Sequence, residues 1–311
     1  MCKNISNYKY KRRLKYALTF RVDPEGRGCD QGHANYIVHN SMIDDFAFYS
    51  NSEGPFATVY YLKKLNFDKL NRNWEASQPK FQKQASELAV IAAELSSSEL
   101  SDLMKISSKL AELNRDRFSQ FITTTLPEVS KQAAFAFAGD TYTGLDADRI
   151  KQENDTFFQD NIRILSGLYG VLRPFDLIQP YRLEMGSRLQ NPQGSNLYEF
   201  WGNQIAKALE DELDQHENRS VINLASEEYF KVVNVKAIPL SVVTPKFLEI
   251  KNGEQKLISF YAKKARGSMA RFIVNNKIIR PKDIKEFNQD GYIFNSEKSD
   301  AETYVFSRKS K

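Results

Sequence analysis

A run of 27 residues without a single acid, residues 256–282, places the tightest constraint on how this 311-residue chain can fold. It reads KLISFYAKKARGSMARFIVNNKIIRPK and contains eight basic side chains. Because these cations have no acid within the run, they must face solvent or meet an anion. The dipeptide Asn252-Gly253 lies just before the run and is typical of a tight β-hairpin. The run therefore begins as the second arm of a hairpin.

We predict a strand over residues 256–261 and then a helix, because Met269, Phe272, Ile273 and Asn276 recur at spacings of three and four. A basic cluster at a strand-to-helix junction lies where helix N-terminal N–H groups also point. Both attract phosphate or another anion. The alternative is an ordinary solvated cationic surface, which the sequence leaves open.

Charge is segregated along the chain. Residues 1–22 hold seven basic side chains and no acid, so this segment and residues 256–282 together carry +15. The whole chain carries only +5, and the remaining residues therefore sum to −10. Such segregation indicates an anionic partner more strongly than the modest total does.

The two cysteines, Cys2 and Cys29, exclude a disulfide scaffold and a four-cysteine zinc site. Cys29 with His33 and His39 could be proposed as a metal site, but their spacing is not that of a ligand motif. We therefore predict no metal and no cofactor. No apolar run approaches the roughly 18 residues that span a bilayer, and no secretory signal is visible. These features predict a cytoplasmic protein without a membrane partner.

The apolar pattern predicts an α+β fold, with a mixed β-sheet and surrounding helices. Helices are expected from Pro79 to Leu95, over residues 96–104, over residues 109–118 and over residues 197–213. Strands are expected at residues 133–138, 221–224, 242–250, 292–294 and 304–306, and residues 161–168 read as a strand or a helix end.

The short helices on either side of residues 105–108 resemble a helix-hairpin-helix, which points backbone N–H groups at a phosphate. Lys105 and Lys109 would add charge there. The usual glycines of that element are absent, and Ser107 and Ser108 stand in their region. Any helical pair with a polar turn has this pattern, so both interpretations stay open.

A second functional hypothesis is an enzyme that processes nucleic acid or nucleotides, like a glycosylase or lyase. Asp140 after a strand, and Glu227, Glu228 and Tyr229 beside Ser226, offer a general base. A lysine held among other cations has a lowered pKa, which suits Schiff-base chemistry. The alternative is that acids in a first helical turn only cap the helix and offset its dipole.

Several blocks follow one another in a specific order: LMKISSKLAELNRDRF, AFAGDTYTGLDA, RILSGLYGVLRPFDLIQPYRLEMG, LYEFWG, VINLASEEYFKVV and ISFYAKKARGSMARFIV. In these blocks, from about residue 77 to residue 308, the chain resembles the bacterial peroxide-stress protein YaaA family. That family begins with a strand ending in Ser-Pro-Ala-Lys. Here residues 63–67 match the tail of that element, but Tyr60-Tyr61-Leu62 replace Ser-Pro-Ala. This departure predicts a disturbed first strand.

The resemblance implies a compact α+β fold with a positively charged cleft, a helix-hairpin-helix on residues 103–113 and binding to duplex or branched DNA. It also implies a role in limiting oxidative DNA damage and free iron. No catalytic activity is established for the family, and the sequence does not determine the oligomeric state. An effect on iron is expected to be indirect, because the matched region has no cluster with ligand spacing.

The domain implied by the resemblance spans residues 56–311. Residues 1–55 are expected to be a poorly ordered extension or a mis-assigned start, the alternative being a basic arm that touches nucleic acid. The expected DNA-binding residues are Lys105, Ser107, Ser108, Lys109, Arg163, Arg173, Arg182, Lys263, Lys264, Arg266 and Arg271.

Overall fold

The computed structural model describes residues 55–60, 64–68, 75–214, 216, 218–237 and 240–310. The predicted N-terminal extension lies outside these residues, except for Pro55. Cys29, His33 and His39, which were considered and set aside as a metal site, and residues 61–63 lie outside them as well.

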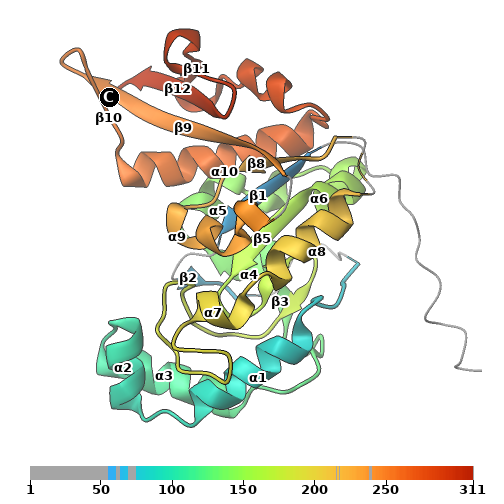
Figure 1. Cartoon of the computed structure of the whole chain (residues 1–311), viewed down its shortest axis with the longest axis vertical. Helices are drawn as coiled ribbons and strands as arrows, with labels where there is room; N and C mark the ends of the chain where they lie inside the picture. Colours follow the sequence, from blue (N-terminus) through green and yellow to red (C-terminus); the bar gives the residue numbers. More distant parts are fainter. Residues whose placement is uncertain are drawn as a thin grey trace, which may run out of the picture. The chain divides into compact units, whose positions relative to one another are not determined.

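Within the described residues, an eight-stranded mixed sheet organises the fold (Figure 1). Its strands lie in the order β11 (Ile293–Phe294), β12 (Thr303–Lys309), β9 (Ser241–Lys251), β8 (Ser220–Asn223), β1 (Phe56–Tyr60), β5 (Ile162–Ser166) and β6 (Gly170–Leu172), with β10 (Glu254–Lys256) paired to β9. Neighbouring strands from β12 to β5 are parallel, whereas β11–β12, β9–β10 and β5–β6 are antiparallel. This arrangement confirms the predicted mixed sheet.

The first strand forms at the centre of the sheet despite the departure that follows it. Ala57 is aligned with Ile162 of β5 on one side and with Ile222 of β8 on the other. Val59 and Ile164 are completely buried, as expected for parallel strands covered on both faces. The prediction of a disturbed first strand was therefore wrong for residues 56–60.

Ten α-helices surround the described strands (Figure 1). They are α1 (Gln82–Ala93), α2 (Ser97–Met104), α3 (Ser108–Ser119), α4 (Ala133–Ala136), α5 (Asp140–Leu145), α6 (Asp155–Asn161), α7 (Leu197–Trp201), α8 (Gln204–Leu213), α9 (Glu227–Phe230) and α10 (Ser259–Asn275). Two small antiparallel pairs join β2 (Lys64–Leu65) to β4 (Phe137–Ala138) and β3 (Lys131–Gln132) to β7 (Leu177–Ile178). No helix of the described part has both the length and the apolar character needed to cross a membrane.

Local signals fixed two boundaries correctly. Ser96 and Glu99 form a reciprocal capping box at the start of α2. Asn252 and Gly253 have φ angles of 53° and 81° and join β9 to β10, as a type I′ hairpin turn requires.

Three predicted elements were wrong. Residues 133–138 form α4 and β4 rather than one strand, which accords with the strong helix propensity of alanine. Residues 197–213 form two helices, because Gly202 takes a positive φ of 47° and ends α7. The strand predicted at residues 256–261 ends at Lys256, and α10 already begins at Ser259.

Two glycines let α10 approach α5 very closely. A Cβ atom at Gly267 would lie 1.8 Å from the Thr141 carbonyl oxygen, and one at Gly144 would lie 2.0 Å from the Lys264 carbonyl oxygen. Neither position tolerates a side chain, because the obstructing atoms belong to backbone. The contact fixes α10 and its basic side chains against the centre of the fold.

We predict that Gly267→Ala lowers the free energy of unfolding by about 3 kcal/mol, because the new methyl group forces the two helices apart. Urea denaturation followed by circular dichroism measures this change. Asn275→Ala, at the exposed end of the same helix, should change it by less than about 0.5 kcal/mol. Equal effects of the two substitutions would contradict the glycine contact.

A second prediction concerns the hairpin turn. Gly253→Ala should cost about 1 kcal/mol of stability, because a Cβ there meets no atom within 4 Å but φ is positive. Asn252→Gly should cost less than Gly253→Ala, since glycine adopts the same turn without strain. A loss of stability in the second variant as large as in the first would show that backbone conformation is not the cause.

Candidate nucleic-acid interface

Lys263 and Lys264 occupy the second turn of α10. The helix buries Ala262, Ala265 and Met269 in the core, so the two lysines are left half-buried at its edge. Neither lysine forms an ion pair with a carboxylate of the described residues. The first turn of α10 contains no acid, and the side chain of Ile258, which precedes it, does not cap the helix. Positive side chains and the N–H groups of the first helical turn therefore lie close together here.

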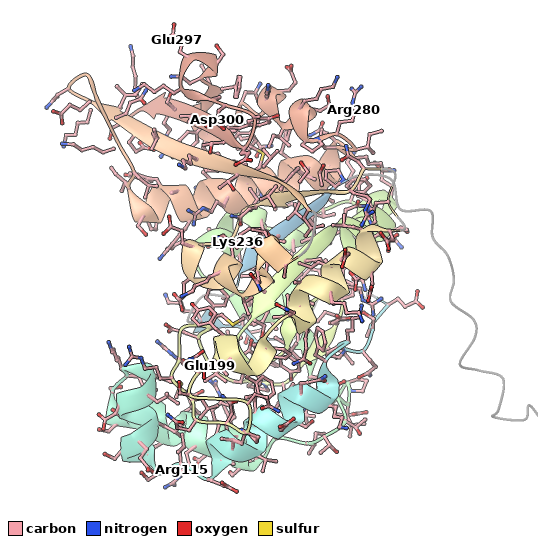
Figure 2. All side chains as sticks on the ribbon, in the orientation of Figure 1. Arg115, Glu199, Lys236, Arg280, Glu297 and Asp300 are labelled. Carbon is pink, nitrogen blue, oxygen red and sulfur yellow. The ribbon has the colours of Figure 1, made fainter. Side chains whose placement is uncertain are left out.

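Other cations of residues 256–282 find acids elsewhere in the fold. Lys256 pairs with Glu254 at 2.7 Å, and Arg271 pairs with Asp146 at 3.2 Å. Arg280 pairs with Asp283 at 2.8 Å. Outside this run, the exposed Arg115 of α3 also lies near an acid, 3.7 Å from Asp116; both arginines are labelled in Figure 2. The stretch that lacks acids in sequence is thus partly neutralised in space.

The helical pair predicted from the sequence is present as α2 and α3. Lys105 ends α2 in the left-handed conformation, with φ of 51°, and Ser107 precedes α3 without capping it through its side chain. The Ser101 side chain closes the turn by donating to the Ile106 carbonyl oxygen at 2.6 Å. Lys105 and Lys109 are exposed, and Ser108 is the first residue of α3.

The α2–α3 pair and α10 rest on different parts of the fold. The α2–α3 pair packs on α1, whereas α10 packs on α5 and β9. The structure therefore groups the predicted residues Lys105, Ser107, Ser108 and Lys109 in one turn, and Lys263, Lys264, Arg266 and Arg271 on one helix.

Arg163 is part of the core rather than of this surface. Its side chain is 6% exposed, donates from Nε to Glu212 at 2.7 Å, and donates from Nη1 to two backbone carbonyl groups. Burial opposes ionisation of Glu212, but the charges of Arg163 and Lys80 outweigh it and lower the pKa of the carboxyl group. Arg163 is thus committed to a buried ion pair and is not available to a phosphate.

Arg173 and Arg182 also have carboxylate partners. Arg173 contacts the buried Asp176 through Nε at 3.2 Å and Nη2 at 3.1 Å; burial raises the pKa of Asp176, although Arg173 opposes the shift. Arg182, whose side chain is 11% exposed, pairs with Glu184 at 3.2 Å. Both ion pairs lie within the segment between β6 and α7, and the Arg173 side chain is still 41% exposed.

The residues suggested for catalysis lie on α5, which packs against α10, and at the start of α9. Glu228 accepts a hydrogen bond from the Gly186 backbone at 3.0 Å, while Ser226 precedes α9 without capping it through its side chain. Among the described residues, no hydrogen bond or ion pair joins Lys263 or Lys264 to Asp140, Glu227 or Glu228. The described part also contains no group of three or more His, Cys, Asp and Glu side chains placed to hold a metal ion.

Sequence reasoning missed three apolar side chains beside the lysines. Leu257, Ile258 and Phe260 are 55%, 36% and 55% exposed at the junction of β10 and α10. The signal was present, because Phe260 stands three and four residues before Lys263 and Lys264 and so shares their helix face. Placing these residues in a strand concealed that relation.

Comparison with known proteins gives a consistent family. The family model described as "Peroxide stress protein YaaA" matches residues 62–298. A UPF0246 protein of Aliivibrio fischeri is 49% identical over 232 residues, covering 75% of this chain and 90% of the relative. UPF0246 proteins of Hahella chejuensis and Ralstonia pickettii are 46% and 47% identical, each over 79% of this chain and 96% of its own length. The match spans most of the sheet and all ten helices of the described part, and the chain therefore belongs to the peroxide stress protein YaaA family.

Proposed function

We propose that this protein binds DNA in the cytoplasm during peroxide stress and recognises the backbone and shape of duplex or branched DNA. The observation that carries the proposal is the pair Lys263 and Lys264, which lacks carboxylate partners among the described residues at the start of a 17-residue helix. Each phosphate that a lysine neutralises releases counterions and adds to affinity. Lysines and helix N–H groups fix position without reading bases.

The turn between α2 and α3 is proposed as a second phosphate contact, acting as a helix-hairpin-helix does. Its backbone N–H groups at the start of α3 have no side-chain cap from Ser107, and the exposed Lys105 and Lys109 flank them. A phosphate would satisfy these groups and gain from the helix dipole. In this proposal the bound protein shields DNA from oxidative damage, and any effect on free iron is indirect.

We predict that the double variant Lys263→Ala with Lys264→Ala weakens binding to duplex DNA and flattens its salt dependence. Removing two phosphate contacts should reduce the slope of log K against log salt by about 2. Fluorescence anisotropy titrations at a series of salt concentrations measure both quantities.

The matched control is Lys83→Ala with Lys207→Ala, which removes the same charge from exposed positions on α1 and α8. This control should keep the wild-type slope. If the two double variants lose affinity equally, only net charge matters and α10 is not the interface. If wild-type protein binds neither duplex nor branched DNA, the proposed function fails.

A further inference from the structure

An exposed apolar edge precedes the two lysines. Leu257, Ile258 and Phe260 follow one another where β10 gives way to α10, and each leaves a third or more of its surface in solvent. Large apolar side chains exposed together in this way mark contact surfaces. Phe260 lies one helical turn, about 5.4 Å, before Lys263 and Lys264 on the same face of α10. A flat apolar ring thus lies beside two cations that have no carboxylate partner among the described residues.

The Phe260 ring is held from behind by a continuous stack. It meets the Tyr261 ring edge-on, with centroids 5.5 Å apart. The Arg308 guanidinium lies 4.8 Å from the Tyr261 centroid and 4.5 Å from that of Tyr292, filling the space between the two rings. The stack therefore runs from an exposed ring on α10 to the interior of the sheet.

A buried carboxylate anchors the inner end of this stack. Glu249 on β9 is 1% exposed and accepts hydrogen bonds from Tyr292 Oη at 2.6 Å and from Arg308 Nε at 2.7 Å. Arg308 also donates to the Asp290 carbonyl oxygen at 2.8 Å. With its guanidinium fixed on three sides, Arg308 fixes Tyr261, and Tyr261 in turn limits how far Phe260 can move.

We propose that Leu257, Ile258 and Phe260 form a stacking edge for unpaired bases of DNA whose phosphates bind Lys263 and Lys264. This inference rests on the proposed function and adds to it a preference for DNA that contains single-stranded nucleotides, such as tails and branch points. A base stacked on an aromatic side chain contributes affinity whatever its sequence, because every base has a flat π-face. Leu257 and Ile258 supply the apolar wedge that proteins use to separate stacked bases.

The same surface fits a membrane less well. A helix that lies in a bilayer interface presents an apolar face along its length. In α10 only the first turn and the residues before it are exposed and apolar, whereas Ala262, Ala265, Met269 and Ile273 are buried in the core. The cations on the exposed face and the rigid ring suit nucleotides, which present phosphate and base at short, regular spacing.

The test compares Phe260→Ala with wild type on a blunt duplex and on the same duplex carrying a single-stranded tail. We expect Phe260→Ala to weaken binding to the tailed duplex on the order of 10-fold for each base stacked and to leave the blunt duplex within about twofold. Phe260→Trp should retain the preference for the tailed duplex. A 2-aminopurine at the first unpaired position should be quenched by wild type and not by Phe260→Ala.

The matched control is Ile293→Ala, which removes a side chain that is 68% exposed on β11 and should change neither affinity. If Phe260→Ala binds both DNAs as wild type does while the lysine double variant weakens both, the stacking edge is overturned and the DNA-binding function stands. Equal weakening on blunt and tailed DNA also overturns it. A third result would overturn it as well: Phe260→Ala loses binding to phosphatidylserine vesicles but binds DNA as wild type does. That result would assign the edge to a membrane.

Discussion

The close crossing of α5 and α10 is the contact on which the position of the candidate interface depends. Gly144 and Gly267 face backbone atoms of the opposite helix, so the two helices meet without side chains between them. Helices that pack through ordinary side chains lie 8–10 Å apart, and glycines permit a closer approach. Because Gly267 and the two lysines lie within one and a half turns of α10, the short helix α5 fixes where the lysines emerge.

Sequence reasoning recovered most of the strands of the sheet but not its connections. β8, β9 and β12 were found from apolar runs, and the hairpin between β9 and β10 from Asn252-Gly253. The parallel pairing of β9 with β12 was not foreseen, because about fifty residues separate the strands and neither carries a signal for its neighbour. Residues 133–138 failed for another reason: a short alanine-rich run suits a buried strand and a buried helix equally.

The candidate site was only half predictable. The acid-free run of residues 256–282 drew attention to Lys263 and Lys264, because no acid lies three or four residues from either lysine. The sequence of the run could not exclude carboxylate partners from distant parts of the chain. Asp146, more than one hundred residues earlier, pairs with Arg271 in the folded protein. Folding likewise brings Glu212 to Arg163, whereas Asp176 and Glu184, the partners of Arg173 and Arg182, lie only two or three residues away in the sequence.

The anchor of Arg308 by Glu249 has a consequence for the order of assembly. Arg308 is synthesised after Glu249, Tyr261 and Tyr292, so the guanidinium that contacts all three in the folded protein is the last of these four groups to be made. Burying that carboxylate without its guanidinium partner would be costly. We therefore expect this corner of the sheet to close only once β12 has been synthesised, and the rings behind the start of α10 to become fixed at the same point.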